Sequence, residues 1–87
     1  MTREECVELI HGDDELLFVD GHDNAIMGVC YRFGQEAIVA YNRRIIIQDL
    51  CEDMTCEIAE AEEFFGFNII GAYVGERTPC FIDSGDM

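Results

Sequence analysis

The chain has 87 residues, with nineteen acidic side chains, five arginines and no lysine, which gives a formal net charge of −14. A surface with this charge repels a bare nucleic-acid backbone and an anionic membrane, and it attracts basic protein surfaces, including those that normally hold DNA or RNA. Because 49% of the residues are hydrophobic, the chain is not a disordered acidic tail, and we expect one folded domain over residues 1–87.

The same composition predicts a cytoplasmic protein. No apolar run approaches the ~20 residues that span a bilayer, and the sequence begins with no basic segment followed by an apolar run, so we expect neither a membrane span nor a signal peptide. The cysteines are odd in number, form no CxxC pair and lie mostly in apolar runs, which favours buried, reduced thiols over disulfides. They are Cys6, Cys30, Cys51, Cys56 and Cys80.

The first half of the chain predicts one helix and three strands. Thr2 and Glu5 have the spacing of a capping box, so a short helix is expected to begin there and to end at Gly12. A turn is expected at residues 20–24, and a hairpin turn is expected around Gly34, which can adopt a positive φ. Strands are predicted, from apolar runs and β-formers, at residues 16–19, 25–33 and 37–41.

The second half predicts two helices and two strands. Asn42 is a good N-cap, and the apolar spacing that follows predicts a helix over about residues 43–53, although three consecutive isoleucines favour a strand by propensity. Thr55 is expected to cap a second helix whose apolar stripe continues to Phe65. Strands are predicted at residues 68–74 and 80–82.

Together these elements predict an α+β fold, with a mostly antiparallel sheet of four to five strands and two to three short helices on one face. The single helical crossover leaves a parallel strand pair open as an alternative.

Two groups of residues are candidates for chemistry, and each also has a structural interpretation. Asp20, His22 and Asp23 lie close enough in sequence to hold a divalent metal or to supply a general base, but they fit no known metal loop and suit a turn better. The cluster of Arg32, Arg43 and Arg44 could bind an anion, but neutralisation of nearby acids is favoured.

The remaining histidine and the cysteines also favour structural roles. His11 suits a helix end, where an imidazole meets the negative end of the dipole. Cys51 and Cys56 suit a core, because no partner base is evident. No catalytic residue, metal ligand or cofactor is therefore predicted, and the chain is expected not to be an enzyme.

The acidic helices are the strongest functional signal. Seven acids follow between residues 49 and 63 with no base among them. An ordinary solvated helix has lysines between its acids, and this one does not. If residues 49–60 formed one helix, four of these acids would make a stripe about 16 Å long. The predicted partner-binding residues are Asp49, Glu52, Asp53, Glu57, Glu60 and Glu63.

A resemblance to a known family bears on the origin of the protein. The segment from Phe67 to Pro79 has the pattern F-N-x-x-G-A-Y-x-G-E-x-T-P, and with the helix before it and a looser match from about residue 16 it resembles a family of small, largely uncharacterised proteins of tailed bacteriophages. Similar proteins usually have glycine at the position of Asp53. The resemblance implies a phage origin and the cytoplasm of an infected bacterium, and it brings no assigned activity or catalytic residues.

Charge and setting together predict a non-catalytic inhibitor that binds a basic, nucleic-acid-binding surface of a host protein, by analogy with nucleic-acid mimics and anti-CRISPR or other anti-defence proteins. The alternative is a phage accessory or assembly protein whose interface is the segment from Phe67 to Pro79. Less favoured is a metal-dependent enzyme at Asp20, His22 and Asp23. The expected partner is a host or phage protein with a basic surface, not nucleic acid or membrane, and homodimerisation through a free sheet edge is left open.

Overall fold

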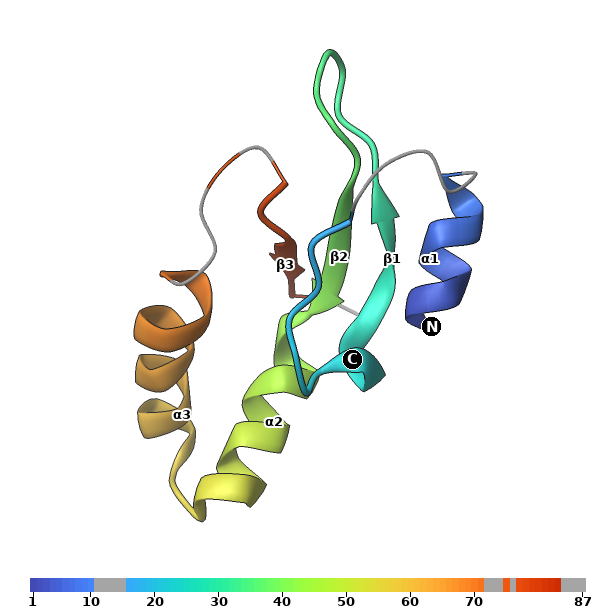
Figure 1. Ribbon diagram of the computed structural model, residues 1–87. Helices are drawn as coiled ribbons and strands as arrows, with labels where there is room; N and C mark the ends of the chain where they lie inside the picture. Colours follow the sequence, from blue (N-terminus) through green and yellow to red (C-terminus); the bar gives the residue numbers. More distant parts are fainter. Residues whose placement is uncertain (11–15, 72–74, 76, 84–87) are drawn as a thin grey trace.

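The computed structural model describes residues 1–10, 16–71, 75 and 77–83, and its α-helices and strands are shown in Figure 1. The described residues form three α-helices, one 3₁₀ turn, one π-helix and three strands. In chain order these are α1 (Arg3–Leu9), the 3₁₀ turn η1 (Asp23–Ala25), β1 (Ile26–Cys30), β2 (Ile38–Asn42), α2 (Arg43–Met54), α3 (Ile58–Phe64), the π-helix η2 (Phe65–Ile70) and β3 (Cys80–Ile82).

The three strands form one mixed sheet in the order β1-β2-β3. The β1–β2 pair is an antiparallel hairpin, with Gly34 at φ 73° in its turn and a bulge between Ile26 and Gly28. The β2–β3 pair is parallel, with Ala40 opposite Cys80, and α2 and α3 lie in the crossover between them. The α+β class and the hairpin are therefore confirmed, but one of the two strand pairings is parallel and not antiparallel.

The prediction of four to five strands was wrong for the described residues, and one missing strand is residues 16–19. This segment has no strand pairing. The backbone amide of Val19 instead donates to the hydroxyl oxygen of the buried Tyr41 at 2.8 Å. Val19 is itself buried, and Leu16 and Phe18 pack against the core. A side-chain acceptor has thus replaced the strand partner that the apolar run led us to expect.

The second missing strand is the predicted one at residues 68–74. Residues 68–70 belong to the π-helix η2, which continues directly from α3 because Phe65 and Ile69 are four residues apart and both are buried on the same side. Residues 72–74 lie outside the described residues, as do His11 and Gly12, where a helix end was expected. Strand β3 appears at residues 80–82 as predicted.

The observed helices agree more closely with the predicted ones than the strands do. Helix α1 begins with the predicted capping box, in which Thr2 accepts from the amide of Glu5 and Glu5 accepts from the amide of Thr2. Helix α2 begins at the predicted N-cap, since the side chain of Asn42 accepts from the amide of Ile45. Figure 1 shows α1 next to the edge strand β1, while α2 leads away from the end of β2 and turns back into α3.

The core lies between the sheet and the first turns of α2, with the inner side of the α3–η2 helix packed onto it. Tyr41 is fully buried and its ring stacks on Phe81 at 5.8 Å between centroids, and Phe65 meets the edge of the same Phe81 ring at 4.9 Å. Aromatic contacts of this kind stabilise beyond the area that they bury. The far end of the α2–α3 hairpin, around Thr55, extends away from this core (Figure 1).

Candidate functional site

The six predicted partner-binding acids lie on the two arms of the α2–α3 hairpin. Asp49, Glu52 and Asp53 belong to α2, Glu57 is the N-cap of α3, and Glu60 and Glu63 belong to α3. Five of the six are exposed. The exception is Asp49, which is half-buried and whose carboxylate accepts a hydrogen bond from the side-chain Nδ2 of Asn24 at 2.7 Å. Asp49 therefore also ties α2 to the turn before β1.

The acids do not form the single stripe that one helix over residues 49–60 would give. Helix α2 ends at Met54, and Thr55 adopts the left-handed conformation at φ 51° and ψ 50° while the amide of Cys56 donates to the carbonyl of Cys51. Thr55 is thus the C-cap of α2, and the prediction that it caps the second helix was wrong. The acids form two short rows on adjacent helices, separated by this turn.

The charges of α2 are arranged against its own dipole. The N-terminal end of a helix favours acids and the C-terminal end favours bases. Helix α2 has no acid in its first turn, where Arg43 and Arg44 lie, and no base in its last turn, where Glu52 and Asp53 lie. Helix stability therefore explains neither Glu52 nor Asp53. In α3 the opposite holds, because Glu60 is in the first turn and there offsets part of the helix dipole.

None of the six acids forms an ion pair with any residue that the structure describes. Within the described residues, Arg3 pairs with Asp20 and Asp23, Arg43 pairs with Glu62 and Asp83, and Arg77 pairs with Glu36. Of these acids only Glu62 lies on the α2–α3 hairpin, on the side of α3 that faces Arg43. Charges without a partner keep their full field toward solvent, so the tip of the hairpin is a region of unbalanced negative potential. We call the exposed acids Glu52, Asp53, Glu57, Glu60 and Glu63, which extend from the turn at Thr55 along α3, the acidic tip.

The turn at residues 20–24 uses its carboxylates structurally. The Nε of Arg3 donates to both carboxylate oxygens of Asp23, at 2.8 and 3.0 Å, and its Nη2 donates to Asp20 at 3.2 Å. The hydrogen bond to Asp23 raises the pKa of the Arg3 guanidinium, and the same guanidinium lies over the Phe18 ring. Together these contacts fasten α1 to the segment before β1. Among the described residues, no three His, Cys, Asp or Glu side chains are grouped as a metal site would need.

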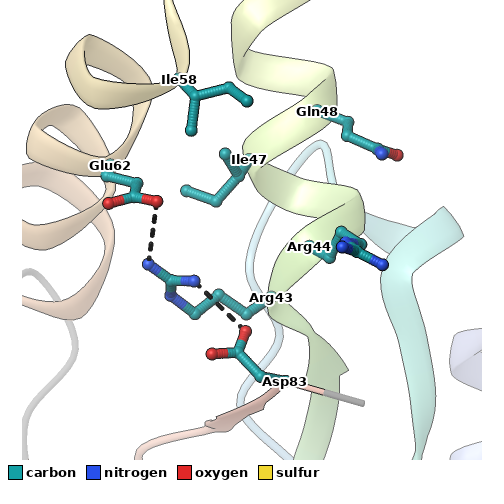
Figure 2. Close-up of a pocket in the computed structure, with 7 residues that line it drawn as sticks. All are labelled: Arg43, Arg44, Ile47, Gln48, Ile58, Glu62 and Asp83. Atoms are coloured by element: carbon teal, nitrogen blue, oxygen red, sulfur yellow. Dashed lines mark hydrogen bonds and ion pairs between the residues drawn. The ribbon is translucent and has the colours of Figure 1, made fainter. Parts of the chain in front are cut away.

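A pocket of about 420 Å³ opens between α2 and α3, and Figure 2 shows its lining. Arg43 lies across it, 3.7 Å from Glu62 and 3.2 Å from Asp83, and its guanidinium is 5.6 Å from the centre of the Phe65 ring. Arg43 therefore neutralises nearby acids, as the sequence predicted. Arg44 also lines the pocket and is exposed, and it has no ion pair within the described part of the chain. Ile47 and Ile58 supply apolar walls.

All five cysteines are free thiols, but the prediction that they are buried was correct only for Cys6. The other four are partly exposed. Burial raises the pKa of the thiols of Cys6, Cys56 and Cys80, which lowers the fraction of reactive thiolate at neutral pH.

Comparisons with protein-family models, with curated proteins and with solved structures give no match. In the part of the chain that the structure describes, no helix combines the length and the apolar character needed to cross a membrane.

Proposed function

We propose that this protein is a phage-type, non-catalytic inhibitor that acts in the cytoplasm of a bacterial host. Its acidic tip, together with Asp49, binds a basic surface of a host protein that normally holds nucleic acid, and it competes there with DNA or RNA. The protein thus acts as a nucleic-acid mimic of the anti-CRISPR or anti-defence kind, and it uses no cofactor or metal.

The observation that supports this proposal is the position of the unpaired acids. Among the described residues, the arginines form ion pairs with Asp20, Asp23, Glu36, Glu62 and Asp83, and the acids of the acidic tip form none, although Glu62 lies on α3 between Glu60 and Glu63 of the tip. Two of them, Glu52 and Asp53, also lie at the end of α2 where the dipole disfavours them, by about 0.3–1 kcal/mol for each charge. A surface that reduces the stability of its own helix in this way favours an interaction role over a purely structural one.

The mechanism would be electrostatic. A region of unbalanced negative charge accelerates association with a positive groove by roughly 10- to 1,000-fold at low ionic strength. Once bound, the acids of the two helical arms would occupy the positions of phosphates and exclude the nucleic acid. Such binding depends steeply on salt, because the screening length falls from about 10 Å at 0.1 M to about 3 Å at 1 M.

The proposal is tested by affinity capture from a bacterial lysate at 0.1 M and 1 M salt, followed by a competition assay with the captured protein and its nucleic acid. The expected result is a nucleic-acid-binding protein that is recovered at low salt and lost at high salt, and that releases its nucleic acid when this protein is added. A second assay repeats the competition with Glu52→Gln and Asp53→Asn combined, which should weaken it at least tenfold.

The matched control is Glu4→Gln combined with Glu8→Gln, which removes two charges from the exposed face of α1. Both double variants have the same net charge, so a loss of competition limited to the first assigns binding to the acidic tip. If the two double variants lose competition equally, the loss depends only on net charge, and the proposed site is contradicted.

The alternative function is a phage accessory or assembly protein that binds through residues 67–79. The observation in its favour is the exposure of apolar side chains in this segment, since Phe67 is 79% exposed and Ile70 is 49% exposed. An interface of that kind remains bound at 1 M salt, so the same capture experiment separates the two functions. A homodimer would be found by light scattering of the purified protein.

A further inference from the structure

The outward side of the α3–η2 helix combines exposed aromatic rings with acids of the acidic tip. Its inward side is set by three buried residues, Ala61, Phe65 and Ile69. Phe67 lies two residues from both Phe65 and Ile69, which is about half a helical turn, and so it projects on the side opposite the core. It is 79% exposed, and Phe64 is 37% exposed.

Each exposed ring has an acid one turn before it. Glu60 precedes Phe64 by four residues, and Glu63 precedes Phe67 by four residues, so each pair lies on the same side of the helix. Both acids are exposed and lack an ion pair in the described chain. Glu60 and Glu63 were predicted contacts, whereas Phe67 was placed only in the alternative interface over residues 67–79 and Phe64 had no predicted role. The four-residue spacing between acid and ring was the available signal.

We propose that this side of the α3–η2 helix docks as an amphipathic helix into an apolar groove of the partner, and that lysine or arginine side chains line the rim of that groove. The inference rests on the proposed function and specifies the partner surface for the same site. Phe64 and Phe67 enter the groove as anchors, while Glu60 and Glu63 pair with the basic rim. Helices commonly bind grooves through anchors at such spacings.

Two features favour this occupant over a second copy of the chain. A twofold contact through the same helix would bring Glu60 and Glu63 close to their own symmetry mates, and like charges in such an interface oppose association. The net charge of −14 on each copy adds to that repulsion. Purely electrostatic mimicry, in turn, leaves Phe67 without a role. A groove with an apolar floor and a basic rim matches both the rings and the acids.

The test has two stages, and the first locates the contact. A photo-crosslinking analogue, benzoylphenylalanine, replaces Phe67 in the full chain, and in a control chain it replaces Phe33, which is fully exposed at the turn of the β1–β2 hairpin. Both chains are irradiated in bacterial lysate at low salt, and the crosslinked peptides are sequenced. Position 67 should crosslink to the captured partner at an apolar site flanked by lysine or arginine, and position 33 should not.

The second stage measures affinity for the purified partner across a salt series. Phe67→Ala should weaken binding about 30-fold, the size of an interface hot spot of ~2 kcal/mol, by a similar factor at every salt concentration. Glu60→Gln combined with Glu63→Gln should weaken it mainly at low salt. Phe33→Ala is the matched control and should leave affinity unchanged. Circular dichroism confirms that each variant is folded.

Each contrary result has a distinct meaning. If position 67 crosslinks to a second copy of the chain, the face is a homodimer interface and the inference is overturned. If Phe67→Ala binds as well as the unmodified chain while the acidic variant is weakened, the groove is absent but the proposed mimicry stands. If neither variant affects binding to a salt-sensitive partner, the inference is overturned, and the Glu52→Gln with Asp53→Asn variant then decides separately whether the proposed site stands.

Discussion

The two ends of helix α2 have opposite charges and opposite surroundings. At its start, Arg43 lies between Glu62 and Asp83 and over the ring of Phe65, so its charge is used within the fold. At its end, Glu52 and Asp53 are exposed and have no such partner among the described residues. The comparison teaches that net charge alone is a poor guide to function. The informative quantity is which acids the protein has left without a cation.

The largest expected effect lies in the core beside the start of α2, where a hydrogen bond anchors residues 16–19 to Tyr41 of β2. Tyr41→Phe removes the acceptor of the buried Val19 amide, and an unsatisfied buried amide destabilises by about 1–3 kcal/mol. Urea denaturation should show a loss of that size. The control is Tyr31→Phe, whose exposed hydroxyl donates to the carbonyl of Leu9, and it should lose much less. Equal losses would show that Tyr41 is not an internal anchor.

A smaller effect is expected at the start of α2. Arg43→Ala removes two ion pairs and the contact with Phe65, which together should lower the free energy of unfolding by about 1 kcal/mol. Arg44→Ala makes the same chemical change at the next position, where no ion pair is seen in the described chain, so it corrects for helix propensity and for the dipole. Thermal unfolding of the two variants should differ by several degrees. Indistinguishable midpoints would mean that Arg43 is not used within the fold.

The smallest effect concerns the acidic tip itself. Glu52→Gln with Asp53→Asn removes two acids from the unfavourable end of α2, whereas Glu57→Gln with Glu60→Gln removes two from the favourable end of α3. At ~0.3 kcal/mol for each exposed charge, the first pair should be about 0.6 kcal/mol more stable than the unmodified chain at low salt, and the second about 0.6 kcal/mol less stable. Because salt screens the dipole interaction, the difference should shrink at 1 M salt. The expected effect of the dipole is contradicted if the Glu57→Gln with Glu60→Gln variant is at least as stable as the Glu52→Gln with Asp53→Asn variant.

Local signals in the sequence predicted the elements that depend on neighbours in the chain. The Thr2–Glu5 capping box, the Asn42 cap and the turn at Gly34 all form as expected, because each depends on residues within a few positions. The three isoleucines after Arg44 did not make a strand, since the N-cap and the helical spacing agreed with each other.

Long-range contacts explain the failures. Residues 16–19 were read as a strand because the hydroxyl of Tyr41 cannot be foreseen as their partner. Residues 68–70 belong to a helix and not to the predicted strand over residues 68–74, because their β-branched residues favour a strand locally while the buried spacing from Phe65 to Ile69 continues the helix. Among the candidate site residues, the positions of the acids on two helices followed from the sequence. The bond between Asp49 and Asn24, and the exposure of Phe67, required the fold.

The parallel pairing of β2 with β3 also bears on the order in which the chain folds. Ala40 meets Cys80 only after a long loop has closed, whereas the β1–β2 hairpin and the α2–α3 hairpin form from neighbouring segments. We therefore expect β3 to dock late. Until it does, the rings of Tyr41 and Phe65 lack their contact with Phe81, and partly folded chains expose apolar surface that favours aggregation. The mutual repulsion of highly acidic chains would keep such intermediates apart while folding is completed.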